Sequence, residues 1–257
     1  MLISIIIPFY DNDYDKIPNI INELNKLTFS KEVIFVDDRN DKSENVFIPS
    51  QYKLVRSHEL LDNVGTFEAR RSGVLNAIGD YIWFIDVDDK LNNITKFPID
   101  EDVAAYEYSL FFNNNSVADS HMLKYLNCTK MEIKSSHNIK AILKYSSLGL
   151  WNKLFKREIL LKTFNKIPFL NKFTKNEDGY TYFEILKNSK IISFKIEHIY
   201  IYCNPYKHES EMKELKVSNK LDEYLENEFP KNCPDRSYYM DFLKGCILWC
   251  MNLKIFY

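Results

Sequence analysis

Apolar residues follow two patterns along the first 90 positions of the chain. Short continuous runs rich in β-branched residues are typical of strands covered on both faces, and apolar residues spaced three or four apart are typical of helices with one buried stripe. The predicted strands are Leu2–Ile7, Glu32–Val36, Tyr52–Arg56 and Tyr81–Ile85, and the predicted helices are Asp15–Leu27 and Gly65–Ile78. This alternation predicts an α/β fold with a mostly parallel central sheet flanked by helices.

The pattern is weaker after residue 90, where Leu91–Ser120 is rich in asparagine. The predicted strands are Ala104–Phe112, Ile191–Phe194 and His198–Cys203, and the predicted helices are His137–Tyr145, Lys156–Phe164 and Glu177–Asn188. The chain is charged and helical in pattern from Lys207 on, and Ser237–Leu253 predicts a final apolar helix. We therefore expect an α/β domain over residues 1–206 and a short helical C-terminal extension over residues 207–257.

Composition and charge exclude several classes of protein. The chain has 257 residues, of which 46% are apolar, enough for one sizeable domain. With 34 basic and 36 acidic side chains it lacks the clustered positive charge that a nucleic-acid partner requires. No apolar run reaches the roughly 18 residues of a membrane span, and the N-terminus reads as a first strand without signal-peptide features. The five scattered cysteines suggest reduced thiols in a cytoplasmic protein.

Three carboxylates follow the strand Tyr81–Ile85 directly, in the sequence Asp86-Val-Asp-Asp89. Two ionised carboxylates about 4 Å apart repel by roughly 4 kcal/mol at an effective dielectric near 20, so a cation is expected beside them. Mg²⁺ or Mn²⁺ fits best, because these ions take one or two protein carboxylates and fill their shell with water and phosphate oxygens. Asp86 and Asp88 point to the same side of a strand, whereas Asp89 points away and suits the turn or a contact behind them. The alternative is a solvated acidic turn in which Asp89 caps a helix.

Other polar residues follow the first two strands. The carboxyl ends of parallel strands meet at one edge of a sheet, which is where ligands bind in such folds. Pro8–Asp11 and the pair Asp37-Asp38 are therefore expected beside Asp86. The aspartate pair either accepts hydrogen bonds from a ribose or a base edge, or it lies in a solvated turn.

The helix predicted at Gly65–Ile78 carries small residues every four positions, an arrangement that lets backbone or ligand approach closely. Gly79 follows it and is expected to end it. Arg70 and Arg71 border its apolar face, so at least one guanidinium should be buried and paired. The partner of that guanidinium is either a carboxylate at the strand ends or a diphosphate. Alternatively, the arginine buries only its methylene groups and its guanidinium lies in water.

A second acidic pair, Glu177-Asp178, opens a helix further along the chain. Such residues either complement the helix dipole or supply a general base that reaches a substrate hydroxyl. The five histidines show no paired metal-ligand spacing, and His208 is either a surface residue or a contact to metal or phosphate.

Taken together, these motifs resemble the family 2 glycosyltransferases, inverting enzymes with the Rossmann-like GT-A fold. The resemblance covers about residues 3 to 205 in the order ISIIIPFYDND, EVIFVDD, NVGTFEARRSGVLNAIGDYIWFIDVDD, WNKLFKREIL and NEDGYTYFEIL. It implies a nucleotide-binding half over residues 1–90 and an acceptor half over residues 91–206. The chain departs from the family pattern at Asp11 and Arg71, where asparagine is usual, and in a loop after Asp38 that is one residue shorter.

The resemblance implies a role for each matching residue. Pro8, Tyr10 and Asp38 would line the base pocket, Arg70 would lie near the diphosphate, Asp86 would contact ribose or metal, Asp88 would coordinate Mn²⁺ or Mg²⁺, and Asp178 would be the catalytic base. The implied reaction moves a sugar, expected from a UDP-sugar, to a hydroxyl of a growing bacterial surface glycan such as lipooligosaccharide or capsule. The acceptor would be a glycan or a lipid-linked sugar.

The C-terminal segment either packs on the core or on a second copy in a homo-oligomer, or it forms an interfacial patch at the inner face of the membrane. Two rival functions stay open: a non-catalytic subunit that binds nucleotide sugars or acts as a scaffold, and a D-x-D phosphotransferase. The phosphotransferase motif normally follows the first strand, whereas the motif here follows a later one.

Overall fold

The structure is a computed structural model that describes residues 1–203 except 12, 41–45, 59–60, 62, 96, 98, 113–114, 120–128, 172 and 174–176. The predicted extension over residues 207–257, its helix at Ser237–Leu253 and His208 lie outside the described residues. Within the described part, no helix is long and apolar enough to cross a bilayer.

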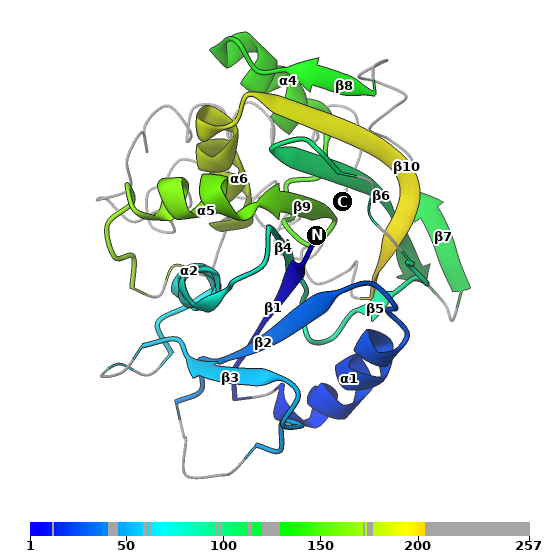
Figure 1. Cartoon of the computed structure of the whole chain (residues 1–257), viewed down its shortest axis with the longest axis vertical. Coiled ribbons are helices and arrows are strands. Elements are labelled where there is room, and N and C mark those ends of the chain that lie inside the picture. The colour runs from blue at the N-terminus through cyan, green and yellow to red at the C-terminus, as the bar shows by residue number, and fades with distance from the viewer. Residues whose placement is uncertain are drawn as a thin grey trace, which may run out of the picture.

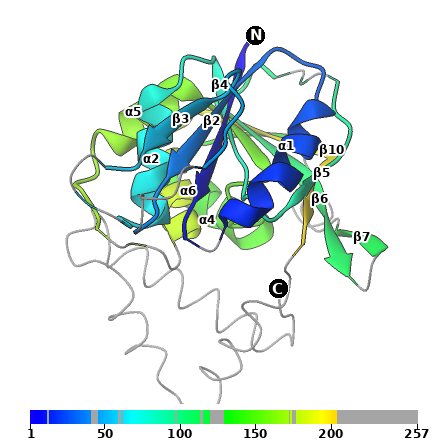
Figure 2. The ribbon, with the colours of Figure 1, turned by 90° about the horizontal axis from the view of Figure 1, so that it is seen from below.

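The first half of the sheet is parallel throughout, as predicted (Figure 1). Its strands are β1 (Ile3–Phe9), β2 (Lys31–Asp37), β3 (Lys53–Arg56) and β4 (Tyr81–Phe84), in the spatial order β3-β2-β1-β4. The helices between them are α1 (Ile17–Asn25), preceded by the 3₁₀ turn η1 (Tyr14–Lys16), and α2 (Thr66–Asn76). Figure 2 shows α1 and α2 on opposite faces of the sheet, which explains why the strands read as continuous apolar runs.

The second half of the sheet mixes parallel and antiparallel strands. The order continues from β4 through β9 (Lys153–Lys156), β6 (Val103–Phe112), β10 (Ile191–Tyr202) and β5 (Lys90–Leu91), and β7 (Asn115–Asp119) and β8 (Lys130–Glu132) pair with β6 and β10. The helices are α4 (Ser136–Tyr145), α5 (Arg157–Phe164) and α6 (Glu177–Asn188). They lie on the same face as α2 (Figure 2).

Two expectations about this half were wrong or incomplete. The strands predicted at Ile191–Phe194 and His198–Cys203 form one strand, β10, whose register against β6 shifts between Lys195 and His198. A bulge of this kind interrupts the two-residue alternation, so the sequence reads as two pieces. The strands β5, β7, β8 and β9 were not predicted.

The end of α2 was also predicted wrongly. The helix ends at Asn76, because Ala77 is already extended (φ −82°, ψ 148°), and Gly79 is therefore not its C-cap. Gly79 is needed instead for a close approach, since a Cβ there would lie 2.5 Å from the Ser4 hydroxyl oxygen. Gly73 lets α2 pack against β1 and β2, because a Cβ there would collide with the Ile6 side chain. For Gly73, close backbone approach is the correct interpretation of the small-residue stripe.

Candidate active site

Arg70 lies at the centre of a carboxylate cluster drawn from both halves of the sheet. Its side chain on α2 is buried, and its Nη1 donates to Glu177 Oε1 at 3.1 Å and to Asp178 Oδ1. Its Nη2 donates to Asp86 Oδ1 at 3.1 Å. The prediction that one guanidinium of α2 is buried and paired by acidic strand ends is confirmed, and the structure brings Arg70, Asp86 and Asp178 together.

The charges of this cluster shift one another's pKa values. Burial alone would lower the pKa of Arg70, but the charges of Asp178, Asp86 and Glu177 outweigh it and raise that pKa. Burial raises the pKa of Asp86 to about 6, with the charges of Asp178 and Asp88 adding to the shift and Arg70 opposing it. Burial and the neighbouring Asp178 raise the pKa of Glu177 well above its usual range. One guanidinium therefore faces more acid than it neutralises, and the site favours a further cation.

Asp88 and Asp89 have different surroundings. The side chain of Asp88 is 34% exposed, and its Oδ2 lies 3.7 Å from Lys16 Nζ. Asp89 is buried and accepts hydrogen bonds from the Tyr200 hydroxyl at 2.6 Å and from the Cys203 backbone N–H at 2.7 Å. Burial and the charge of Asp86 raise the pKa of Asp89 to about 8. Asp89 makes the expected supporting contact, but β4 ends at Phe84, so Asp86–Asp89 form a turn and not the strand from which that contact was argued.

Asp86 and Asp88 are the residues that could hold a metal ion. Among the described residues, no group of three or more histidine, cysteine, aspartate or glutamate side chains is arranged around a common point. Two carboxylates suit Mg²⁺ or Mn²⁺, which complete their shell with water and substrate phosphates. The buried Arg70 Nε has no hydrogen-bond partner within the described residues.

The residues expected at the base pocket lie at the same edge of the sheet. Pro8 is in β1 beside Val36 of β2, and Tyr10 follows β1 with 42% of its surface exposed. Asp38 follows β2, and its N–H donates to the Phe9 carbonyl at 2.9 Å. The site thus combines an exposed aromatic ring with a carboxylate.

The Asp38 carboxylate is buried among donors of its own chain. It accepts hydrogen bonds from the Ser57 hydroxyl at 2.5 Å, the Val64 N–H at 2.8 Å and the Gly65 N–H at 3.0 Å. Gly65 is the N-cap of α2 and has a positive φ of 96°, which glycine adopts without strain. Asp38 therefore holds the backbone that leads into α2, so the solvated-turn alternative is wrong for it.

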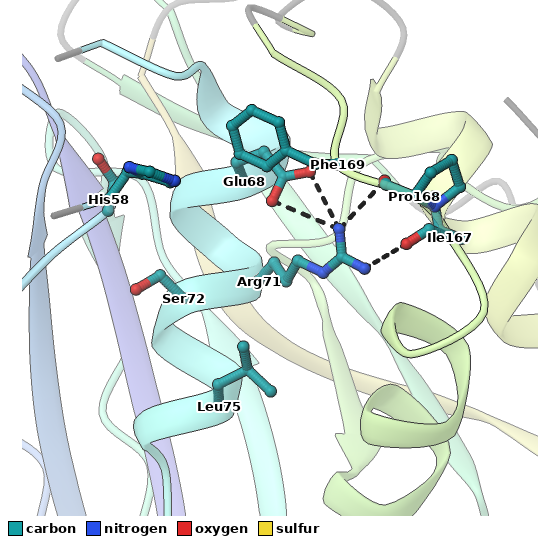
Figure 3. A pocket seen from close by; sticks show the side chains of 9 residues that line it. His58, Glu68, Arg71, Ser72, Leu75, Ile167, Pro168 and Phe169 are labelled. Carbon is teal, nitrogen blue, oxygen red and sulfur yellow. Dashed lines mark hydrogen bonds and ion pairs between the residues drawn. The ribbon is translucent and has the colours of Figure 1, made fainter. Parts of the chain in front are cut away.

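Arg71 points from α2 toward the chain at Ile167 and Pro168 (Figure 3). Its Nη1 donates to Glu68 Oε1 and to the Pro168 carbonyl, both at 3.1 Å, and its Nη2 donates to the carbonyls of Phe164 and Ile167. Arg71 thus ties the chain after α5 to α2.

Beside Arg71 lies a cavity of about 470 Å³. Its lining residues are Ser57, His58, Glu68, Arg71, Ser72, Leu75, Ile167, Pro168 and Phe169. None of the carboxylates bound to Arg70 lines it, so this cavity is separate from the carboxylate cluster.

Sequence reasoning assigned no role to Lys153, although the segment that contains it was part of the family resemblance. Lys153 of β9 is fully buried, and its Nζ donates to the carbonyls of Ser147 at 2.7 Å and Gly149 at 2.5 Å and to Asn152 Oδ1 at 2.7 Å. Burial lowers the pKa of Lys153 to about 7, while the charge of Asp178 acts in the opposite direction.

The same segment orients the carboxylate of Asp178, because the Leu150 N–H donates to its Oδ2 at 3.3 Å. The available sequence signal was that Lys153 directly precedes the apolar residues Leu154 and Phe155. A lysine drawn into the core by such neighbours needs hydrogen-bond partners there.

The fold is of the GT-A type, and comparisons with known proteins relate the chain to glycosyltransferases. Residues 4–95 match the family model of Glycosyl transferase family 2. Over 95 residues the chain is 37% identical to an uncharacterized glycosyltransferase of Haemophilus influenzae, which covers 36% of this chain and 38% of that protein. The match to the family model includes Asp38, Arg70, Asp86 and Asp88 but not Asp178.

The fold is similar to crystal structures of S. aureus TarS 1-349. The free protein matches with a TM-score of 0.57 and 21% identity over 84% of this chain and 65% of that one. The complex with UDP-GlcNAc matches with a TM-score of 0.59 and 20% identity over 84% and 66%. The chain thus spans just under two thirds of the length of TarS 1-349 and well under half of the Haemophilus relative.

Proposed function

We propose that the protein transfers a sugar from a nucleotide diphosphate, with a UDP-sugar as the expected donor, to an acceptor hydroxyl with inversion. The observation that carries this proposal is the cluster on Arg70, which joins Asp86 at the end of β4 to Asp178 on α6. The solved complexes of TarS with UDP-GlcNAc and with UDP support the choice of donor.

Asp178 is the proposed catalytic base. Its side chain is 22% exposed, against 12% for Glu177, so it is the more accessible member of the pair. Arg70 and the Leu150 N–H hold one oxygen each, which fixes the direction of the carboxylate. Asp178 takes the proton of the acceptor hydroxyl as that oxygen attacks the sugar carbon, and the bond from that carbon to the diphosphate breaks.

Asp88 and Asp86 are the proposed ligands of Mn²⁺ or Mg²⁺. When bound, the ion supplies positive charge for the leaving diphosphate. Arg70 adds a buried guanidinium on the same side of the site, and Lys16 lies beside Asp88. Pro8, Tyr10 and Asp38 are the proposed base pocket.

The acceptor rests on the family resemblance alone, and the location rests on the five scattered cysteines. We propose a growing surface glycan or lipid-linked sugar as the acceptor and the cytoplasm as the location, with peripheral membrane contact through the C-terminal segment. Removal of residues 245–257, followed by measurement of membrane recovery, tests that contact; unchanged recovery would contradict it.

The test of the reaction is sugar-nucleotide turnover, with UDP, GDP, CDP and dTDP sugars compared in the presence of Mn²⁺ and of a chelator. Asp178→Asn is expected to lower kcat by roughly 10²–10⁴-fold, the usual contribution of a general base. Asp88→Asn and the chelator should each abolish turnover. Asp80→Asn is the matched control, because Asp80 is exposed and precedes β4, whereas the site follows it.

Three outcomes would overturn parts of the proposal. Full transfer by Asp178→Asn would exclude Asp178 as the base, and turnover unaffected by chelator would exclude the metal. Donor binding without turnover in the wild-type protein would favour the non-catalytic binding subunit.

A further inference from the structure

Tyr200 joins the acidic turn after β4 to the last strand of the sheet. Its hydroxyl accepts a hydrogen bond from the Asp86 N–H at 3.0 Å and donates one to Asp89 Oδ2 at 2.6 Å. The second Asp89 oxygen accepts from the Cys203 N–H at 2.7 Å. Both ends of the turn Asp86–Asp89 are therefore hydrogen-bonded to β10 or to the residue that follows it.

The Tyr200 ring is itself held by rigid neighbours. It is fully buried and stacks on Trp151, with ring centroids 4.8 Å apart and an interplanar angle of 22°. The Trp151 carbonyl accepts a hydrogen bond from Trp83 Nε1 of β4 at 2.6 Å. The hydroxyl of Tyr200 therefore has a fixed position relative to the strand that leads into the turn.

The turn needs such support because its own bonding is weak. The Asp89 N–H donates to the Asp86 carbonyl at 3.3 Å, a long hydrogen bond. Asp86 and Asp88 are two residues apart in this turn, and two ionised carboxylates held close together repel one another. Repulsion acts to spread the two side chains, whereas a shared ligand requires them to converge.

We propose that Tyr200 and Asp89 are positioning residues that hold Asp86 and Asp88 in the arrangement that binds a divalent cation together with a nucleoside diphosphate. The inference rests on the proposed function, since it assigns these residues to the same site. Neither residue touches the substrate; both act through the backbone of the turn. Partners of this kind behind a metal ligand typically change affinity or activity by 10–100-fold when they are removed.

The test uses Tyr200→Phe, which keeps the ring stacked on Trp151 and removes the hydroxyl. Mn²⁺ binding is measured on the full chain with UDP and no acceptor, from the electron paramagnetic resonance signal of free Mn²⁺. We expect affinity for Mn²⁺ to fall by about 10–100-fold, and kcat to fall with it at limiting Mn²⁺. The KM for the acceptor should not change, and excess Mn²⁺ should restore the rate.

Tyr81→Phe is the matched control. Tyr81 is also buried, lies at the start of β4, and donates its hydroxyl hydrogen bond to the Glu101 carbonyl at 2.9 Å. It should lose stability in a similar way but keep wild-type affinity for Mn²⁺. If Tyr200→Phe does not fold, Asp89→Asn, which keeps the shape of the side chain, is measured instead and should weaken Mn²⁺ binding in the same direction.

The outcomes separate this inference from the proposed function. If the positioning variant binds Mn²⁺ and UDP as tightly as the wild type while Asp88→Asn does not, the inference is overturned and the metal site stands. If Tyr81→Phe weakens Mn²⁺ binding as much as Tyr200→Phe, the effect is one of general stability and the inference is also overturned. If the wild-type protein itself binds no Mn²⁺ with UDP, both the inference and the proposed metal site fall.

Discussion

The two halves of the sheet differ in how they are built and in what they give to the site. The half formed by β1 to β4 is wholly parallel, and each strand lies beside others of the first 84 residues. The half formed by β5 to β10 joins strands that are distant in sequence, such as β6 and β10. The first half supplies Asp38, Arg70, Asp86 and Asp88, and the second supplies Glu177, Asp178 and Tyr200. Neither half contains the whole site.

Because each half of the sheet supplies only some of the site residues, the proposed reaction depends on the contact between the two halves. The two halves meet where β4 pairs antiparallel with β9. Arg70 links them, because it forms ion pairs with Asp86, which follows β4, and with Asp178 on α6. The turn that carries Asp86 and Asp88 is hydrogen-bonded to Tyr200 of the second half, and the proposed base lies on α6, so both parts of the site depend on the complete sheet.

The largest effect is expected from Arg70→Ala, which breaks this link between the halves. It leaves Asp86, Glu177 and Asp178 without their shared cation, and loss of one partner of a buried ion pair typically costs about 3–5 kcal/mol. Urea unfolding should show this fall in the free energy of unfolding, and transfer should be lost. Arg70→Lys is the matched control, which keeps a charge but not the planar fork and should lose less stability. An unchanged urea midpoint in Arg70→Ala would contradict the bridging role.

A smaller effect is expected within the parallel half, from Gly73→Ala. The new Cβ would meet the Ile6 side chain and lie 3.2 Å from Val36 Cγ2, so α2 must shift away from the sheet. Overpacking of this kind typically costs about 1–3 kcal/mol. Thermal unfolding of Gly73→Ala should show it, whereas Ser72→Ala, at a partly exposed position of the same helix, should change stability by no more than about 0.5 kcal/mol. Equal stability of the two variants would show that the close approach is not required.

The smallest effect is expected in the second half, from Glu177→Gln. Burial and Asp178 raise the pKa of Glu177 above its usual value near 4.5, so the folded protein holds a proton that the unfolded chain releases. The free energy of unfolding therefore falls as pH rises above about 4.5, and this fall should be shallower in the glutamine variant. Transfer should continue, because Asp178 is the proposed base. Loss of transfer in Glu177→Gln together with full activity of Asp178→Asn would reverse the assignment.

The same comparison explains how much of the fold was predictable. All strands and both long helices of the parallel half were predicted, because each is a local run or stripe of apolar residues. In the other half β9 was not predicted, because Lys153 and Lys156 enclose only two apolar residues. Lys153 can be buried only because the carbonyls of Ser147 and Gly149 accept hydrogen bonds from it, and these contacts exist only in the folded chain. The bulge at Lys195 hid the continuity of β10 for a similar reason, since only the pairing with β6 reveals it.

Within the site, the residues that carry charge were predictable and those that support them were not. Asp86 and Asp178 are charged residues at a strand end and a helix start, and Arg70 is a charged residue beside the apolar face of a helix, so the sequence alone draws attention to them. Tyr200 resembles any tyrosine of an aromatic strand, and its role depends on a contact with a residue 114 positions away. The roles assigned to Pro8, Tyr10 and Asp38 stay predictions.

The internal hydrogen bonds of Asp38 constrain how such an enzyme can evolve. If the proposed base pocket is correct, one carboxylate both recognises the nucleotide and anchors the backbone of Val64 and Gly65 that leads to Arg70. A mutation of Asp38 that altered donor preference would at the same time loosen the helix that carries the bridging guanidinium. New donor preferences are therefore more accessible through Tyr10 or the shortened loop after Asp38, where a change leaves that anchor intact.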